Sequence, residues 1–195
     1  MPPAIRFSRE AVLNAAYQLI RREGPQALNA RAVAKELGGS TQPIFRLFSG
    51  MEELKQAVTE LALTTWKDCL RERLLGSAFP YLTIGMSFLL FARDEPELFK
   101  LLFMRDRVSD GSCTDYNVNW GIPLIEDSVK VDIETARKLY ERNWLYCYGL
   151  AVSIATKYIP CMSECTMRQL LVESLQGVAL QLNVELPTID QCKDI

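Results

Sequence analysis

The feature that most constrains this chain is the spacing of helix start and stop signals in its first fifty residues. Ser8 precedes a run of apolar residues at helical spacing, and Gly24-Pro25 ends that run, as an N-cap and a C-terminal glycine do. A second helix is predicted to begin after Asn29 and to end at Gly38-Gly39. A third is predicted to follow, with Pro43 in its first turn, where the missing N–H costs no hydrogen bond. The spacing therefore predicts three short helices.

The two helices on either side of Gly38 have the features of a helix-turn-helix. Ala34 gives the first helix a small residue where the second must approach it, and Gly38 can adopt the positive φ that the turn requires. Val33 and Ile44 supply apolar contacts between the helices. In this motif the second helix enters the major groove with its first turn at the base edges. The sequence therefore predicts binding of double-stranded DNA through residues 29–51.

The rest of the chain is also predicted to be helical, since it has no useful period-two alternation and no hairpin dipeptide. Ser49-Gly50-Met51-Glu52 has the S-x-x-E pattern of a capping box, which predicts the start of a fourth helix. Val108–Asn119 is the best loop candidate. The predicted helices after the third cover residues 51–75, 80–93, 95–105, 120–130, 132–158 and 163–183. We therefore expect an all-α chain, with a three-helix helix-turn-helix head (1–50) and a larger helical ligand-binding and dimerisation body (51–195).

Composition excludes several function classes. The 195 residues include no histidine, which removes the usual general base and the commonest transition-metal ligand. We therefore expect no enzymatic activity, no cofactor and no metal site. Residues 1–50 carry seven basic and three acidic side chains, a net charge of +4, whereas the remainder carries 15 and 21, a net charge of −6. This asymmetry is expected when only one end of a protein meets phosphate.

Cellular context is inferred from what the sequence lacks. It begins without the charged and apolar regions of a signal peptide. The apolar stretches 78–92 and 144–155 fall below the roughly 18–20 residues that span a bilayer. We therefore expect a soluble, cytoplasmic protein with no membrane partner and with reduced cysteines. A redox role for Cys161 and Cys165, four residues apart, stays open.

Residues 8–54 resemble the DNA-binding head of the TetR family. The resemblance rests on the runs 32–40 (AVAKELGGS), 44–48 (IFRLF) and 52–54 (EEL), with weaker likeness at 94–99 and 144–149. It implies a dimeric transcriptional regulator. The sequence departs from the family where Phe45 replaces a tyrosine that gives its hydroxyl to a phosphate. It departs again where Met51 replaces a lysine and Gly39 an apolar turn residue.

The helix-turn-helix and the resemblance together suggest a set of DNA contacts. Gln42 can pair bidentately with adenine, and Arg46 with guanine or a phosphate, although both could be ordinary solvated residues. The candidate DNA-binding residues are Asn29, Arg31, Ser40, Thr41, Gln42, Phe45, Arg46 and Met51.

The body is predicted to carry a ligand site and a dimer interface. The run Trp144–Val152 is apolar almost all round, so it must be covered on every side, either within the protomer or by a partner. The predicted interface comprises Leu150, Ile154, Met167, Leu171, Ser174, Leu175 and Val178, which would form a four-helix contact about a two-fold axis. Aromatic residues concentrate in the middle of the chain, and ligand sites are mostly apolar. The predicted ligand-binding residues are Phe88, Phe103, Tyr116, Trp120, Trp144 and Tyr148.

These features favour one function and leave an alternative. We expect a ligand-responsive regulator, a repressor, that binds a palindromic operator as a homodimer and is released by a small, mainly apolar effector. The alternative is a helical ligand-binding protein or an enzyme whose helix-turn-helix is non-functional.

Overall fold

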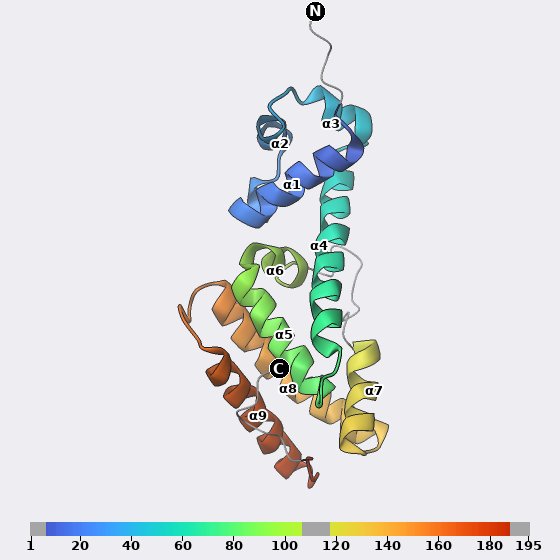
Figure 1. Cartoon of the computed structure of the whole chain (residues 1–195), viewed down its shortest axis with the longest axis vertical. Helices are drawn as coiled ribbons and strands as arrows, with labels where there is room; N and C mark the ends of the chain where they lie inside the picture. Colours follow the sequence, from blue (N-terminus) through green and yellow to red (C-terminus); the bar gives the residue numbers. More distant parts are fainter. Residues whose placement is uncertain (1–6, 107–117, 188–195) are drawn as a thin grey trace, which may run out of the picture. The chain divides into compact units, whose positions relative to one another are not determined.

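The structure is a computed structural model that describes residues 7–106 and 118–187, for 118–120 the backbone alone (Figure 1). Within these residues the chain is helical and has no strand, which confirms the predicted all-α fold. The elements are α1 (Arg9–Glu23), the 3-10 helix η1 (Pro25–Ala27), α2 (Ala30–Glu36), α3 (Gln42–Leu47), α4 (Met51–Leu74), α5 (Pro80–Asp94), α6 (Pro96–Phe103), α7 (Val118–Val129), α8 (Ile133–Ala155) and α9 (Glu164–Gln181). Each α-helix agrees with its prediction to within a few residues at each end, whereas η1 was not predicted.

The helices form two compact units. The head unit contains the chain up to Lys67 together with Glu95–Arg105, and so α1–α3, most of α4, and α6. Of the described residues, the body unit contains Asp68–Asp94, Asp106 and residues 118–187, and so α5, α7, α8 and α9. The short helix α6 thus belongs with the head, although residues 75–95 separate it in sequence from α4. The boundary predicted at residue 50 divides the chain by function and stays a prediction.

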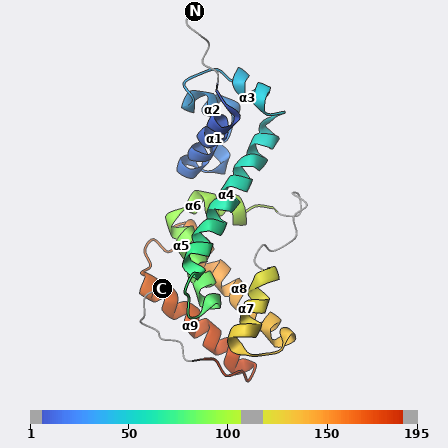
Figure 2. The same cartoon turned by 45° about the vertical axis from the view of Figure 1, so that its right-hand side comes forward.

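Helix α1 has the two ends that the sequence predicts. The Ser8 hydroxyl accepts a hydrogen bond from the N–H of Ala11 at 3.0 Å, which caps the first turn. Gly24 ends the helix at a φ of +90°, where a Cβ would lie 2.6 Å from a carboxylate oxygen of Glu97 on α6. The backbone angle therefore requires glycine, whereas the Glu97 carboxylate ends a flexible side chain and could move. Helix α1 packs against α2 and α6, and its grouping with α2 and α3 can be followed in Figure 2.

Helix α4 contributes one apolar stripe to the head unit. Leu54, Val58, Ala62 and Trp66 recur every fourth residue and are at most 1% exposed, as expected for the buried face of a helix. The Trp66 ring meets Phe103 of α6 edge to face, with centroids 6.0 Å apart. These contacts make α6 part of the head unit's core.

The start of α4 corrects one detail of the sequence analysis. The predicted capping box paired Ser49 with Glu52, but the Ser49 N–H donates to the Glu53 carboxylate at 2.6 Å. The helix begins at Met51, so Glu53 occupies its third position, from which a side chain reaches back to the preceding turn. The motif was therefore placed one residue too early. The predicted loop at 108–119 lies mostly outside the described residues.

The body unit is built around α5, which packs against α7, α8 and α9 (Figure 1). Ten of the fifteen α5 residues are buried, because neighbours cover it on several sides. A second cluster joins α7, α8 and α9 through Ile125, Leu139 and Leu175, each at most 2% exposed. Within the described residues, every helix is too short or too polar to cross a membrane.

Candidate functional site

The helix pair α2–α3 has the geometry that a helix-turn-helix requires. Val33 on α2 and Ile44 on α3 are fully buried, and Ala34 is 5% exposed. Gly38 adopts a φ of +66° in the turn between the helices. The N–H of Gly39 donates to the carbonyl of Ala34 at 3.0 Å, which fixes the end of α2. The small residue, the positive-φ glycine and the apolar contact thus occupy their expected places.

The starts of both helices are defined locally. The Asn29 side chain accepts from the N–H of Ala32 at 3.0 Å and donates to the carbonyl of Ala27 at 3.1 Å. Its amide therefore caps α2 and stabilises the loop before it. Thr41 precedes α3 without a side-chain capping bond, and Pro43 lies in the first turn. The Thr41 hydroxyl is consequently available at the start of the helix.

The structure brings most predicted DNA-binding residues to the surface of the head unit. Six are exposed and two are half-buried. The exposed residues are Asn29, Arg31, Ser40, Gln42, Phe45 and Arg46, and the half-buried ones are Thr41 and Met51. Of these, Asn29 already uses its side chain as a cap. The polar and aromatic side chains of α3 are thus directed outward, while Ile44 anchors the helix.

The basic residues of the head unit fall into two groups. Arg9 pairs with Glu53 at 2.7 Å, and Arg22 pairs with Glu36 at 2.9 Å. By contrast, Arg31 and Arg46 form no salt bridge with a carboxylate among the described residues. Arg31 on α2 and Arg46 on α3 are therefore two cations that can meet phosphate.

Comparison with known proteins agrees with this geometry. Residues 12–58 match the family described as bacterial regulatory proteins, tetR family. This match covers α1–α3 and the start of α4 and includes the turn at Gly38. Residues 12–58 therefore form a DNA-binding domain of the TetR type. The family consists of transcriptional regulators and is typically non-enzymatic, which agrees with the expectation from the sequence.

Solved structures resemble this chain in fold over nearly its whole length. A TetR-like transcriptional regulator from Rhodococcus sp. RHA1 matches with a TM-score of 0.65 and 18% identity, over 92% of this chain and 98% of that one. A protein from Vibrio parahaemolyticus, described as a transcriptional regulator of the TetR family, matches with a TM-score of 0.54 and 20% identity, over 87% and 97%. Comparison with curated protein sequences gave no match. At these identities the likeness is one of fold.

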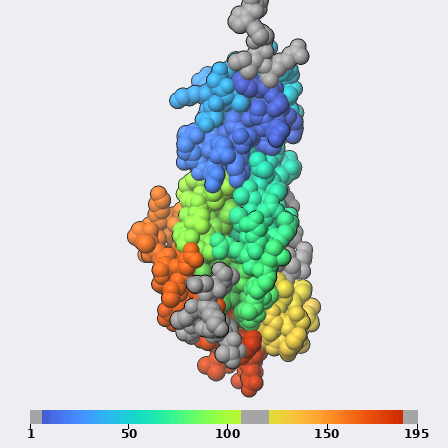
Figure 3. Space-filling model, viewed as in Figure 1, coloured from blue at the N-terminus to red at the C-terminus, as the bar shows by residue number. Residues whose placement is uncertain are grey.

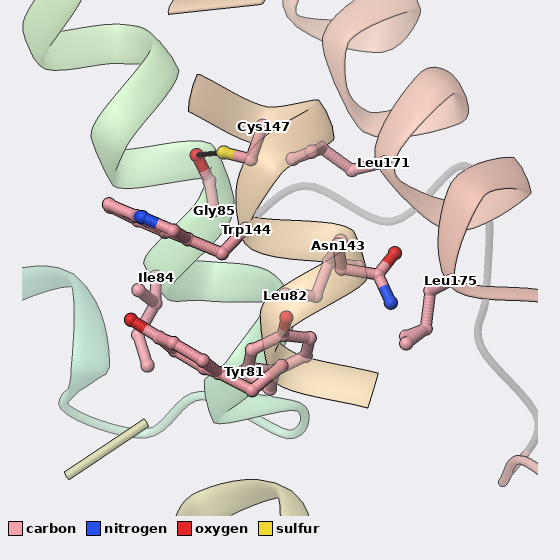
Figure 4. Close-up of a pocket in the computed structure, with 10 residues that line it drawn as sticks. Tyr81, Leu82, Ile84, Gly85, Asn143, Trp144, Cys147, Leu171 and Leu175 are labelled. Carbon is pink, nitrogen blue, oxygen red and sulfur yellow. Dashed lines mark hydrogen bonds between the residues drawn. The ribbon is translucent and has the colours of Figure 1, made fainter. Parts of the chain in front are cut away.

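The body unit contains a small pocket between α5, α8 and α9. Its volume is about 30 Å³. Figure 4 shows the rings of Tyr81 and Trp144 on one side and the side chains of Leu171 and Leu175 on the other. The residues that line it are Tyr81, Leu82, Ile84, Gly85, Tyr140, Asn143, Trp144, Cys147, Leu171 and Leu175. The lining is mostly apolar and contains no charged side chain.

The polar groups of the pocket are neutral. Asn143 donates to the carbonyl of Leu139 at 2.9 Å and accepts from the Ser174 hydroxyl at 3.0 Å. The Cys147 thiol faces the Gly85 carbonyl, with 3.7 Å between sulfur and oxygen (Figure 4). Burial raises the pKa of Cys147 to about 12 and raises the pKa of Tyr81 well above its ordinary value. Both groups are therefore protonated at neutral pH.

The predicted ligand-binding residues are only partly brought together. Trp144 lines the pocket, and Phe88 packs behind it with ring centroids 4.7 Å apart. Tyr148 stacks on Phe88 at 6.4 Å without lining the pocket. Phe103 lies in the core of the head unit instead, because it packs against Trp66. Tyr116 and the side chain of Trp120 lie outside the described residues.

Sequence reasoning missed most of the pocket lining. On α8 the lining residues are Tyr140, Asn143, Trp144 and Cys147. Their spacing of i, i+3, i+4 and i+7 is that of one helix face. The sequence shows this periodicity, but the predicted ligand site contained aromatic residues only and so omitted Asn143 and Cys147.

The predicted dimer residues lie mainly inside the protomer. Met167, Leu171 and Leu175 are at most 8% exposed, and the two leucines line the pocket. Ile154 is also 8% exposed, while Leu150, Ser174 and Val178 are half-buried. Met167, Leu171 and Leu175 turn inward because α5 and α8 already cover that face of α9. An interface on α8 and α9 that uses these residues stays a prediction, and Leu150, Ser174 and Val178 keep part of their surface exposed in the protomer.

The outer faces of α8 and α9 carry exposed apolar residues. Leu145 is 72% exposed on α8, and Leu180 is 79% exposed on α9. A Cβ placed at Gly149 or Gly177 would meet nothing within 4 Å, so both positions allow close approach. Figure 3 shows surface atoms of these helices in orange and red. Such a face is a candidate surface for association.

Proposed function

We propose that this TetR-family regulator represses transcription by binding a palindromic operator as a homodimer, and that a small neutral effector releases it. The observation that carries the DNA-binding part is the outward face of α3, with Gln42, Phe45 and Arg46 exposed on a helix anchored by buried Ile44. A recognition helix needs this division, because its inner face holds the domain while its outer face meets the bases.

The proposed dimer forms through the outer faces of α8 and α9. Leu145 and Leu180 would be buried against a second copy, with Gly149 and Gly177 allowing the helices to approach. A two-fold dimer places its two heads one helical turn of DNA apart, about 34 Å, or a multiple of this spacing. This arrangement supports the proposal that the operator is a palindrome.

The proposed effector site is the pocket between α5, α8 and α9. It offers apolar walls and neutral polar groups, so it suits an uncharged and mainly apolar molecule. Drug-sized ligand sites measure about 300–1,000 Å³, far more than the volume of this pocket. The effector would therefore bind an expanded form, in which Leu171 and Leu175 move away from Trp144. A ligand that binds only this form shifts the population toward it.

The experiment that tests DNA binding is selection from a random duplex library at low salt. We expect enrichment of a palindromic sequence whose affinity falls with salt, with a slope of about −0.9 per phosphate contact. The Arg46→Ala variant should bind this operator more weakly by about 1–3 kcal/mol if Arg46 contacts a base. Lys138→Ala on the body unit is a matched control that removes one exposed cation elsewhere. Enrichment of no sequence would contradict the proposal.

Release is tested by titrating an effector, found by a ligand screen, with and without operator DNA. Coupling is reciprocal, so operator DNA should weaken effector binding by the same factor as effector weakens DNA binding, typically about 5- to 150-fold. Trp144 lines the pocket, and its fluorescence should change on binding. A Leu171→Trp variant should fill the pocket and abolish binding. Equal dissociation constants with and without DNA would show that the body does not control the head.

A further inference from the structure

We propose that Phe45 is a specificity-determining residue that contacts the 5-methyl group of a thymine in each operator half-site. This inference rests on the proposed DNA binding and names what one side chain of α3 recognises. It begins from the exposure of Phe45, whose side chain is 55% accessible although phenylalanine is normally buried. An aromatic ring so exposed on the helix that faces DNA has no structural role in the free head unit.

The contrast with Phe48 shows that the exposure is specific to one position. Phe48 lies three residues later, is 2% exposed, and has the Arg9 guanidinium 4.3 Å above its ring. Phe45 has no ring or cation partner among the described residues. The chain therefore buries Phe48, directly after α3, and presents Phe45 on α3 to solvent.

The chemistry of phenylalanine limits what it can recognise. Its side chain neither donates nor accepts hydrogen bonds, so it cannot pair with a phosphate or with the polar edge of a base. Among the base edges in the major groove, only thymine presents an apolar group, its 5-methyl. Burial of this methyl against the ring removes apolar surface of both partners from water. Thymine is therefore the base that Phe45 can distinguish.

Gln42 places this contact within the half-site. Residues three apart lie on one face of a helix, with Cβ atoms about 5–6 Å apart, and Gln42 is exposed like Phe45. Stacked base pairs are about 3.4 Å apart, so the two side chains would meet base pairs one or two steps apart. Glutamine pairs bidentately with adenine. We therefore expect each half-site to contain an adenine and, within two base pairs, a thymine contacted by Phe45.

The test replaces thymine by deoxyuridine, which removes the 5-methyl group and keeps the hydrogen-bonding edge. In the operator selected by the full-length protein, each symmetry-related pair of thymines is substituted in turn. We expect deoxyuridine at one of these pairs to lower the affinity of the wild-type protein for the operator about fourfold per half-site. This factor corresponds to the free energy of burying one methyl group. Phe45→Ala should lose a similar factor on the thymine operator and should not distinguish the deoxyuridine operator from it.

Two variants separate the methyl contact from other effects. Phe45→Tyr keeps the ring and should keep the sensitivity to deoxyuridine. Gln42→Ala should lose discrimination at the adenine while the sensitivity at the thymine remains. Because Phe45 is exposed, we expect the unfolding temperature of Phe45→Ala to equal that of the wild type.

The possible outcomes distinguish this inference from the proposed function. A selected operator at which no deoxyuridine substitution affects the wild type would overturn the role of Phe45 and leave DNA binding intact. Sensitivity that persists in Phe45→Ala would assign the methyl contact to another side chain and would also overturn it. If selection yields no operator, the proposed DNA binding itself fails.

Discussion

The Arg9 guanidinium on α1 donates to the Glu53 carboxylate on α4 at 2.7 Å. The other oxygen of that carboxylate accepts from the Ser49 N–H at 2.6 Å. One side chain thus caps α4 and joins it to α1. The hydrogen bond from Ser49, and then that from Arg9, lowers the pKa of Glu53 to about 2.

We predict that Glu53→Gln destabilises the protein at neutral pH. The pKa of Glu53 is lower in the folded state than its ordinary value of 4.5, so the charged carboxylate stabilises the fold above pH 4.5. This contribution is lost as the pH falls through about 2. We expect Glu53→Gln to lower the unfolding temperature by about 2 °C at pH 7 and to differ less from wild type as the solution is acidified. The matched control is Glu52→Gln in the same turn. An equal effect of both substitutions would contradict a specific cap.

Gly38 should be the turn position least tolerant of a side chain. Its φ is +66°, and a Cβ would meet nothing within 4 Å, so backbone strain alone opposes substitution. We expect Gly38→Ala to lower the free energy of unfolding by about 1–2 kcal/mol, and Gly38→Asn to cost less, because asparagine tolerates this conformation better. Gly50→Ala, also in open space but without a positive φ, is the control. Urea denaturation compares the three variants; an Asn variant no more stable than the Ala variant would argue against backbone strain.

The buried thiol of Cys147 should be unreactive in the folded protein. Burial raises its pKa to about 12, so at pH 8 only about one thiol in ten thousand is ionised, and the thiolate is the reactive form. We expect alkylation by iodoacetamide, followed by mass spectrometry of peptides, to modify exposed Cys161 and Cys165 first. Cys147 should react only with unfolding or with opening of the pocket. Modification of all three at similar rates would show that the pocket is open to solvent.

Charge on the outer faces of α8 and α9 should dissociate the proposed dimer. Leu145→Glu or Leu180→Glu would bury a carboxylate without a partner, which we expect to raise the dimer Kd at least about a hundredfold. Leu75→Glu, at a residue as exposed as Leu180, is the control and should leave the dimer intact. Analytical ultracentrifugation measures the change. Leu171→Glu should instead unfold the protomer, because Leu171 is 8% exposed within it. A wild-type monomer at micromolar concentration would contradict the dimer.

Much of the head could be predicted from sequence because its signals act within one helical turn. Ser8 and Asn29 cap their helices through side-chain bonds to an N–H three residues away. Gly38 adopts the positive φ that the turn demands. Such features depend on bonds between near neighbours, so residue type and spacing suffice to predict them. The error at the start of α4 was a single residue, since Glu52 and Glu53 both lie in its first turn.

Only the tertiary structure shows which helices pack against each apolar helix face. The pattern of α9 predicted an apolar stripe with Met167, Leu171 and Leu175, but it could not show whether α5 and α8 or a second protomer would cover it. It also could not show that α6 joins the head unit, where Phe103 packs against Trp66. The hydrophobic effect is non-directional, so burial against any surface that excludes water stabilises the fold. The periodicity of the sequence therefore determines which residues are buried. The packing of helices that are distant in sequence determines which element each of these residues contacts.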